Sequence, residues 1–187
     1  RGDMKLFASC LAVFVLLAAG SALADYANDR AEIENLSNKY MVAVDAGDIE
    51  TVMSTWADDG ILEWIFGIER GKDEIRKAMS NFGGARYREI PDGATSRPRM
   101  RHQIINHVID VDGDRATTTA YWFAMSNDNP EQEARLVFFG HYEDRLERID
   151  GEWRFKVRTV YNEGRDNKKL WYPELGEIDP RTRKPPE

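Results

Sequence analysis

The stretch "MRHQIINHVIDVDGDRATTTAYWFAM", residues 100–125, contains two extended segments separated by the sequence Asp-Gly-Asp. Branched and aromatic residues, which favour strands, fill both segments, and an Asp-Gly pair favours the tight turn of a β-hairpin. Two more extended segments, residues 134–149 and 153–161, flank a second Asp-Gly pair at residues 150 and 151. The second half of the chain is therefore predicted to form a meander of antiparallel strands.

The residues before this meander have the periodicity of helices. Ile33, Leu36, Tyr40 and Val44 recur at helical spacing, so they predict a helix with one apolar stripe, and Gly47 ends that helix. Helices followed by a strand meander indicate an α+β fold, in which a curved antiparallel sheet closes over the helices.

Three shorter elements are predicted between the first helix and the meander. Asp48 is a suitable N-cap for a second helix, residues 58–60 indicate a turn, and residues 61–66 indicate a short strand. A third helix is expected after Gly71. The apolar faces of these two helices are predicted to consist of Ile49, Val52, Met53 and Trp56, and of Ile75, Met79 and Phe82.

The N-terminal segment, residues 1–24, has the pattern of a signal peptide. Lys5 precedes an apolar run over residues 11–19, and residues 22–24 form an Ala-x-Ala cleavage site. Residues 1–3 then lie upstream of the start codon. We expect one folded domain over residues 25–164, a charged and proline-rich tail over residues 165–187, and a secreted or periplasmic protein without stable membrane insertion. The alternative is a retained anchor over residues 6–24, although the apolar run is short for a bilayer span.

Composition excludes several classes of protein. Cys10 is the only cysteine and lies in the predicted signal peptide, so thiolate metal sites, cysteine nucleophiles and disulfides are not expected in the mature chain. The formal net charge is −7, which argues against a nucleic-acid partner.

Residues 83–99 contain glycine, proline and arginine without sustained periodicity. Long segments of this kind are either mobile surface loops or functional lids. As a lid, the segment would bring Arg86, Arg88, Arg97 or Arg99 to an anionic ligand at a pocket mouth.

Strand parity separates the two histidines of the opening stretch. Side chains alternate faces along a strand, so His102, Ile104 and Asn106 are predicted to face one pocket, whereas His107 points away. Two histidines on opposite faces cannot ligate one ion, so no metal site is expected.

Asp45 is the candidate partner of His102. It closes the first predicted helix beside the apolar stripe, where a carboxylate can orient an imidazole and balance the charge of the imidazolium. Two alternatives remain open: Asp45 caps the corner near Gly47, or His102 is a packed core residue.

Three segments carry a resemblance to a known family: residues 40–60, 101–106 and 140–155, "YMVAVDAGDIETVMSTWADDG", "RHQIIN" and "GHYEDRLERIDGEWRF". They resemble the SnoaL-like polyketide-cyclase group of the nuclear transport factor 2-like superfamily, which also includes hexachlorocyclohexane dehydrochlorinase, scytalone dehydratase and bile acid dehydratases. The resemblance covers about residues 27–163. It implies a cone-shaped α+β fold, with a strongly curved antiparallel sheet and N-terminal helices enclosing one apolar pocket.

The resemblance also implies roles for individual residues. Asp45 and His102 match a proton-abstracting dyad, Tyr40 matches a phenol that polarises a carbonyl, and Trp56 matches a pocket tryptophan. Ser126 departs from the pattern, because it stands near the position where a dehydratase acid would be expected.

The predicted function is cofactor-free proton abstraction by the Asp45–His102 dyad, with Tyr40 and Asn106 donating hydrogen bonds and Ile104 lining the pocket. The outcome would be a β-elimination, as in a dehydratase, or an isomerase or cyclase reaction on a small hydrophobic, cyclic substrate. The alternatives are a non-catalytic binding or dimerisation module of the same fold and a structural subunit of a larger enzyme. The expected partners are a small hydrophobic ligand and a second copy of the chain in a homo-oligomer.

Overall fold

A computed structural model of the chain describes residues 3–84 and 99–164, of which residues 3–24 and 81–84 are described by their backbone alone. The elements in chain order are α1 (Asp3–Ala46), α2 (Ile49–Ser54), β1 (Trp56–Trp64), β2 (Gly67–Arg70), α3 (Gly71–Gly84), β3 (Met100–Asp112), β4 (Arg115–Ser126), β5 (Arg135–Ile149) and β6 (Glu152–Asn162). The α+β class and the strand meander predicted from the sequence are both confirmed.

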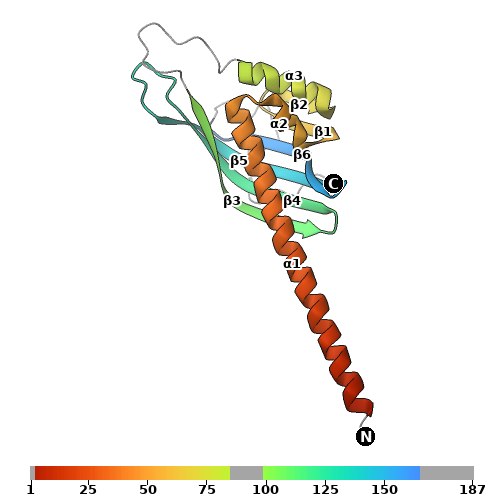
Figure 1. The fold of residues 1–187 in the computed structure, drawn as a ribbon. Coiled ribbons are helices and arrows are strands. Elements are labelled where there is room, and N and C mark those ends of the chain that lie inside the picture. The colour runs from red at the N-terminus through yellow and green to blue at the C-terminus, as the bar shows by residue number, and fades with distance from the viewer. Residues whose placement is uncertain (1–2, 85–98, 165–187) are drawn as a thin grey trace, which may run out of the picture.

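The strands form one curved sheet in the order β2-β1-β6-β5-β4-β3. All neighbouring pairs are antiparallel except β1 and β6, which are parallel. Helix α1 crosses one face of the sheet, and α2 and α3 lie at the end where α1 stops (Figure 1). The face of the sheet toward α1 is called the inner face below, and the opposite face the outer face.

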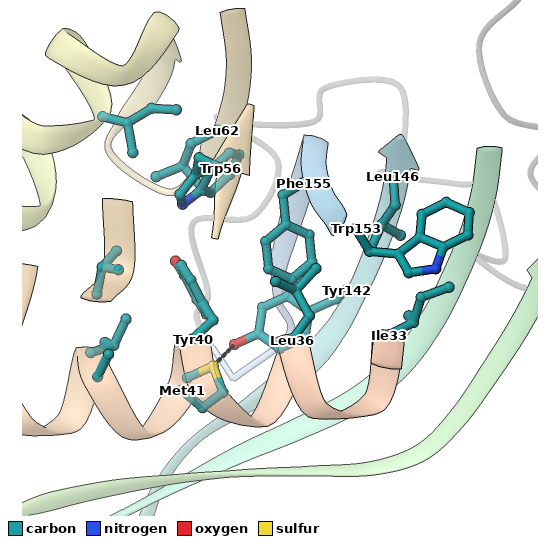
Figure 2. Packing of buried hydrophobic residues seen from close by; sticks show 14 of the residues in the cluster. Ile33, Leu36, Tyr40, Met41, Trp56, Leu62, Tyr142, Leu146, Trp153 and Phe155 are labelled. Atoms are coloured by element: carbon teal, nitrogen blue, oxygen red, sulfur yellow. Dashed lines mark hydrogen bonds between the residues drawn. The ribbon is translucent and has the colours of Figure 1, made fainter. Parts of the chain in front are cut away.

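The apolar stripe of α1 packs against the inner face. The predicted stripe residues Ile33, Leu36, Tyr40 and Val44 are all buried. They contact a core that also contains Met41, Trp56, Leu62, Tyr142, Leu146, Trp153 and Phe155 (Figure 2). Each fully buried large apolar side chain contributes about 1.5–3 kcal/mol, so this interface fixes α1 on the sheet.

The corner between α1 and α2 has the predicted form. Gly47 adopts a positive φ of 72°, and the backbone N–H groups of Gly47 and Asp48 donate to the carbonyls of Val44 and Ala43. Asp48 caps α2, because its carboxylate accepts hydrogen bonds from the backbone N–H and the hydroxyl of Thr51.

Two predicted boundaries near this corner are wrong. Trp56 does not belong to α2 but begins β1, and residues 58–60 lie within that strand rather than in a turn. The register of β1 against β6 shifts between Trp56 and Ile61, so the two aspartates occupy an irregular stretch of strand. Asp58 and Asp59 form ion pairs with Lys72 and Lys156, which explains polar residues here without a chain reversal.

The tight hairpin turns are confirmed. Gly113 between β3 and β4 has a φ of 58°, and Asp150 and Gly151 between β5 and β6 have φ values of 52° and 82°. These left-handed conformations are the ones that Asp-Gly turns provide.

Residues 3–24, which include most of the predicted signal peptide, continue α1 as a helix that extends past the sheet (Figure 1). Within the part of the chain that the structure describes, no helix is both long and apolar enough to span a membrane. The tail over residues 165–187 and Arg86, Arg88 and Arg97 lie outside the described residues, so their assignments stay predictions. Arg99 is described and exposed.

Candidate active site

Asp45 and His102 are in direct contact. Asp45 is the next-to-last residue of α1, and its Oδ1 lies 2.7 Å from Nδ1 of His102, the third residue of β3. The second carboxylate oxygen accepts the backbone N–H of the same histidine at 2.8 Å. The side chains are 7% and 9% exposed respectively, so the pair is shielded from solvent.

This geometry sets the tautomer of the imidazole. A carboxylate only accepts hydrogen bonds, so in the neutral ring Nδ1 carries the proton and Nε2 carries the lone pair. Because the backbone of His102 holds the other oxygen, the carboxylate cannot rotate away from the ring without breaking a second bond. The helix end is closed by backbone N–H groups and α2 is capped by Asp48, so the alternative of Asp45 as a corner cap is not supported.

A β-bulge corrects the parity prediction for β3. The register against β4 shifts between Ile105 and Val108, and Asn106 adopts a positive φ of 53°. His102 and Ile104 face inward as predicted, and Ile104 packs against the core. Beyond the bulge the faces exchange, so Asn106 is exposed and His107 turns inward; Asn106 is therefore not retained as a pocket residue.

The inward turn also removes the parity argument against a metal site. Among the described residues, however, no group of histidine, aspartate and glutamate side chains is arranged to hold a metal ion. The buried Nε2 of His107 has no hydrogen-bond partner there, and burial lowers the pKa of this imidazole.

Tyr40 and Trp56 lie in the core between α1, β1 and β6. The Tyr40 ring packs edge-on against Trp56 and Phe155, and its hydroxyl lies 4.0 Å from Sδ of Met79 in α3. Trp56 is completely buried. Five residues along a helix correspond to a rotation of about 140°, so Tyr40 and Asp45 project from different sides of α1.

Two aromatic residues that the sequence reasoning missed continue the inner face from the Asp45–His102 pair. The ring centroid of Trp122 lies 6.0 Å from that of His102 and 5.7 Å from that of Tyr142, on which it stacks. The indole N–H donates to the carbonyl of His141, which fixes the indole along the sheet. Alternation along β4 and β5, where Trp122 and Tyr142 occupy inward positions, was the signal that could have found them.

A buried ion pair lies beneath Tyr142. Arg158 donates from Nε and Nη2 to the two oxygens of Asp144 at 2.8 and 2.7 Å, and Thr118 donates to Asp144 at 3.0 Å. The guanidinium carbon lies 4.4 Å from the centroid of the Tyr142 ring and 4.6 Å from that of Tyr40. Burial acts to lower the pKa of Arg158, but its attraction to Asp144 outweighs burial and the pKa is raised, so the cation is permanent.

Two hollows lined by described residues lie away from this pair. One borders α1 and the turn between β5 and β6, and the other borders the turn between β3 and β4; neither includes Asp45 or His102.

Comparison with known proteins establishes the family. A model of the SnoaL-like domain matches residues 25–159, so the chain belongs to the SnoaL-like domain family. No curated protein sequence matches this chain.

Solved structures share the fold. A nuclear transport factor 2-like protein with a cystatin-like fold from Novosphingobium aromaticivorans superposes with a TM-score of 0.65 at 21% identity, covering 83% of this chain and 96% of its own. The crystal structure of LinA gives 0.62 at 20% identity, with 75% and 89% covered. A candidate scytalone dehydratase from Novosphingobium aromaticivorans gives 0.60 at 20% identity, with 73% and 85% covered. These likenesses show a common fold, in agreement with the predicted superfamily.

Proposed function

We propose that this protein is an exported SnoaL-like enzyme that uses the Asp45–His102 dyad to abstract a proton from carbon without a cofactor. The proposed substrate is a small, hydrophobic, cyclic molecule with an acidic C–H bond. The reaction is a β-elimination of the dehydratase type, or a proton relocation of the isomerase or cyclase type.

The observation that carries the proposal is the double contact of Asp45 with His102. One carboxylate oxygen meets the imidazole Nδ1 and the other meets the backbone N–H, in a nearly buried setting. A carboxylate that only capped the end of α1 would accept hydrogen bonds from that corner, whereas Asp45 binds the side chain and backbone of a residue in β3. Such a pair holds the imidazole in one tautomer and orientation, which a general base requires.

The mechanism follows from this orientation. His102 Nε2 removes the proton, and the electron pair of the C–H bond moves toward an adjacent carbonyl or expels a leaving group such as water. Asp45 balances the positive charge that the imidazole acquires. His102 then returns its proton to the leaving group, to another carbon or to solvent. Both the base and its charge partner are side chains, so the step is complete without a metal or cofactor.

The surroundings and the family agree with a hydrophobic substrate. The neighbours of the dyad on the inner face are the indole of Trp122 and the half-buried Ile104. Dehydration, the reaction named for the candidate scytalone dehydratase of the same fold, is itself a β-elimination. Export rests on the signal-peptide pattern of residues 1–24, and a homo-oligomer stays a prediction.

The test uses 5-nitrobenzisoxazole, an uncharged bicyclic carbon acid. A base removes its ring C–H proton, the N–O bond breaks, and the coloured 2-cyano-4-nitrophenolate forms without any other reactant. We expect turnover by the full chain and a loss of about 10²–10⁴-fold in His102→Ala, the range for removal of a general base.

The matched control is His141→Ala. His141 also contacts a carboxylate, Glu163, but projects from the outer face. Equal rates in wild type and His102→Ala would contradict the proposal and would leave a non-catalytic binding module as the better description.

A further inference from the structure

Tyr142 is a buried phenol one aromatic ring away from the dyad. The indole of Trp122 lies between His102 and Tyr142 and is close to both rings. The ring centroids of His102 and Tyr142 therefore lie no farther apart than the sum of their two distances to the centroid of Trp122. A cyclic molecule that spans the edge of this indole can present a C–H bond to His102 and an oxygen atom to Tyr142.

The Tyr142 hydroxyl is held by a weak acceptor. It points toward α1 and donates to Sδ of Met41 at 3.6 Å (Figure 2). A thioether accepts hydrogen bonds weakly, so an oxygen of a ligand is the better partner. Met41 precedes Asp45 by one helical turn and shares its side of α1, so this hydroxyl meets α1 next to the dyad carboxylate.

The surroundings keep this phenol protonated and polarised. Burial raises the pKa of Tyr142 far above its usual value, so the hydroxyl is a hydrogen-bond donor at every physiological pH. The guanidinium of Arg158 lies against the ring, 4.4 Å from its centroid, and is itself held by Asp144. A cation against the ring draws electron density from the phenol, so the O–H bond strengthens as a donor when negative charge forms on its partner.

The second buried phenol points another way. Figure 2 shows the Tyr40 hydroxyl on the side of Trp56 and Leu62, whereas the Tyr142 hydroxyl lies on the side of Met41. The two hydroxyls thus occupy different compartments of the core, and the one next to the helix face that carries Asp45 belongs to Tyr142.

We propose that Tyr142, and not Tyr40, donates the hydrogen bond that stabilises the oxyanion formed when His102 removes the proton. The inference rests on the proposed function and adds a requirement to it: the substrate carries an acceptor oxygen separated from its acidic carbon by about the width of the indole. Tyr142 is a catalytic residue in this assignment, and Arg158 is a positioning residue that acts through it.

The test varies the oxyanion. Turnover of unsubstituted, 5-chloro- and 5-nitrobenzisoxazole is measured, since their phenolate leaving groups differ in basicity. Removing one oxyanion donor costs about 10²–10³-fold in kcat, so Tyr142→Phe should lose that much with the least activated probe and less with the nitro compound. The dependence of rate on leaving-group pKa should therefore steepen. Tyr161→Phe is the matched control, because that phenol donates to Glu143 and should keep both rate and slope.

The outcomes separate the two proposals. An unchanged slope in Tyr142→Phe overturns this inference, even if the rate falls, because a packing defect slows all the probes alike. A steeper slope in Tyr40→Phe instead returns the donor role to Tyr40. If His102→Ala keeps the wild-type rate, the proposed function itself fails.

A binding measurement gives a readout that does not depend on turnover. Quenching of tryptophan fluorescence measures the affinity for 2-cyano-4-nitrophenolate and for the uncharged 4-nitroanisole. We expect Tyr142→Phe to weaken phenolate binding by at least about 10-fold, as for loss of a charge-assisted hydrogen bond, and to leave the anisole unaffected. Equal loss for the two probes, or no loss, overturns the assignment.

Discussion

The two faces of the sheet each carry a histidine in contact with a carboxylate, and the two pairs differ in everything beyond that contact. On the inner face, both oxygens of Asp45 bind His102, and the ring faces the indole of Trp122. On the outer face, His141 Nδ1 lies 2.5 Å from Oε1 of Glu163, whose side chain is 37% exposed.

The surroundings of Nε2 and of the ring also distinguish the His141 pair. Nε2 of His141 lies 4.0 Å from Glu143, and the His141 ring is covered by a stacked Tyr161 ring 4.2 Å away. Both ring nitrogens of His141 thus lie beside carboxylates, so neither is placed to take a proton from carbon. The comparison teaches that a short histidine–carboxylate distance occurs on both faces, and that the second contact, to the backbone N–H, sets the inner pair apart.

The largest expected effect is a loss of turnover when the inner-face pair is changed, but not when the outer-face pair is changed. If Asp45 and His102 act as one unit, Asp45→Asn, His102→Ala and the double variant should all lose most of the turnover of 5-nitrobenzisoxazole, about 10²–10⁴-fold, with little further loss in the double variant. Glu163→Gln on the outer face should retain the rate. The rates are compared at equal folded concentration. Multiplicative losses in the double variant would show that the two residues contribute independently.

The next effect concerns stability and the buried ion pair of the inner face. Asp144→Leu leaves the Arg158 cation buried and unpaired, which costs about 3–5 kcal/mol in the free energy of unfolding. Replacing both residues by Leu and Met should recover most of that loss. Glu163→Gln should cost less than about 1 kcal/mol, because an ion pair with an exposed partner is screened by water. Urea unfolding measures all three, and a double variant no more stable than Asp144→Leu would refute the explanation.

The fold could be read from the sequence wherever one periodicity persists. The stripe of Ile33, Leu36, Tyr40 and Val44 and the alternation of β4 follow their patterns from end to end, and the structure buries the residues that those patterns select. The Asp45–His102 contact could also be predicted from the sequence. Asp45 lies at the end of a helix and His102 lies near the start of β3, before the bulge, so the shift in register does not affect either position.

Two other features near the site depend on β-bulges, which a hydrophobic pattern does not reveal. The bulge at Asn106 exchanged the faces of His107 and Asn106. A second register shift follows the turn between β5 and β6. That turn pairs Leu146 with Phe155, and regular pairing would then set Asp144 opposite Val157; the shift at Lys156 sets it opposite Arg158 instead. Without that extra residue Arg158 would lie on the outer face, so parity could not have found the ion pair.

A smaller effect compares two aspartates at one corner. Asp48→Ala removes the cap of α2 and should lower the midpoint of thermal unfolding, while turnover per folded molecule stays unchanged. Asp45→Asn should show the reverse, a large loss of turnover with less effect on unfolding. Calorimetry and the elimination assay on the same samples measure both quantities. A turnover defect in Asp48→Ala would contradict the assignment of Asp48 to a purely structural role.

The smallest effect concerns His107, the inner-face histidine whose Nε2 has no partner among the described residues. Burial lowers its pKa in the folded protein below the ordinary value of 6.5, so between the folded and the unfolded pKa the unfolded chain binds more protons. Stability must therefore rise with pH in that window and fall as the pH drops below 6.5. His107→Leu removes this titration and should flatten that part of the profile. Urea unfolding at a series of pH values from 4.5 to 7.5, taken as the difference between wild type and His107→Leu, isolates it from the other carboxylates and histidines. A difference that does not change with pH would mean that the imidazole gains a proton as readily in the folded protein as in the unfolded chain, and hence that its inward position carries no electrostatic cost.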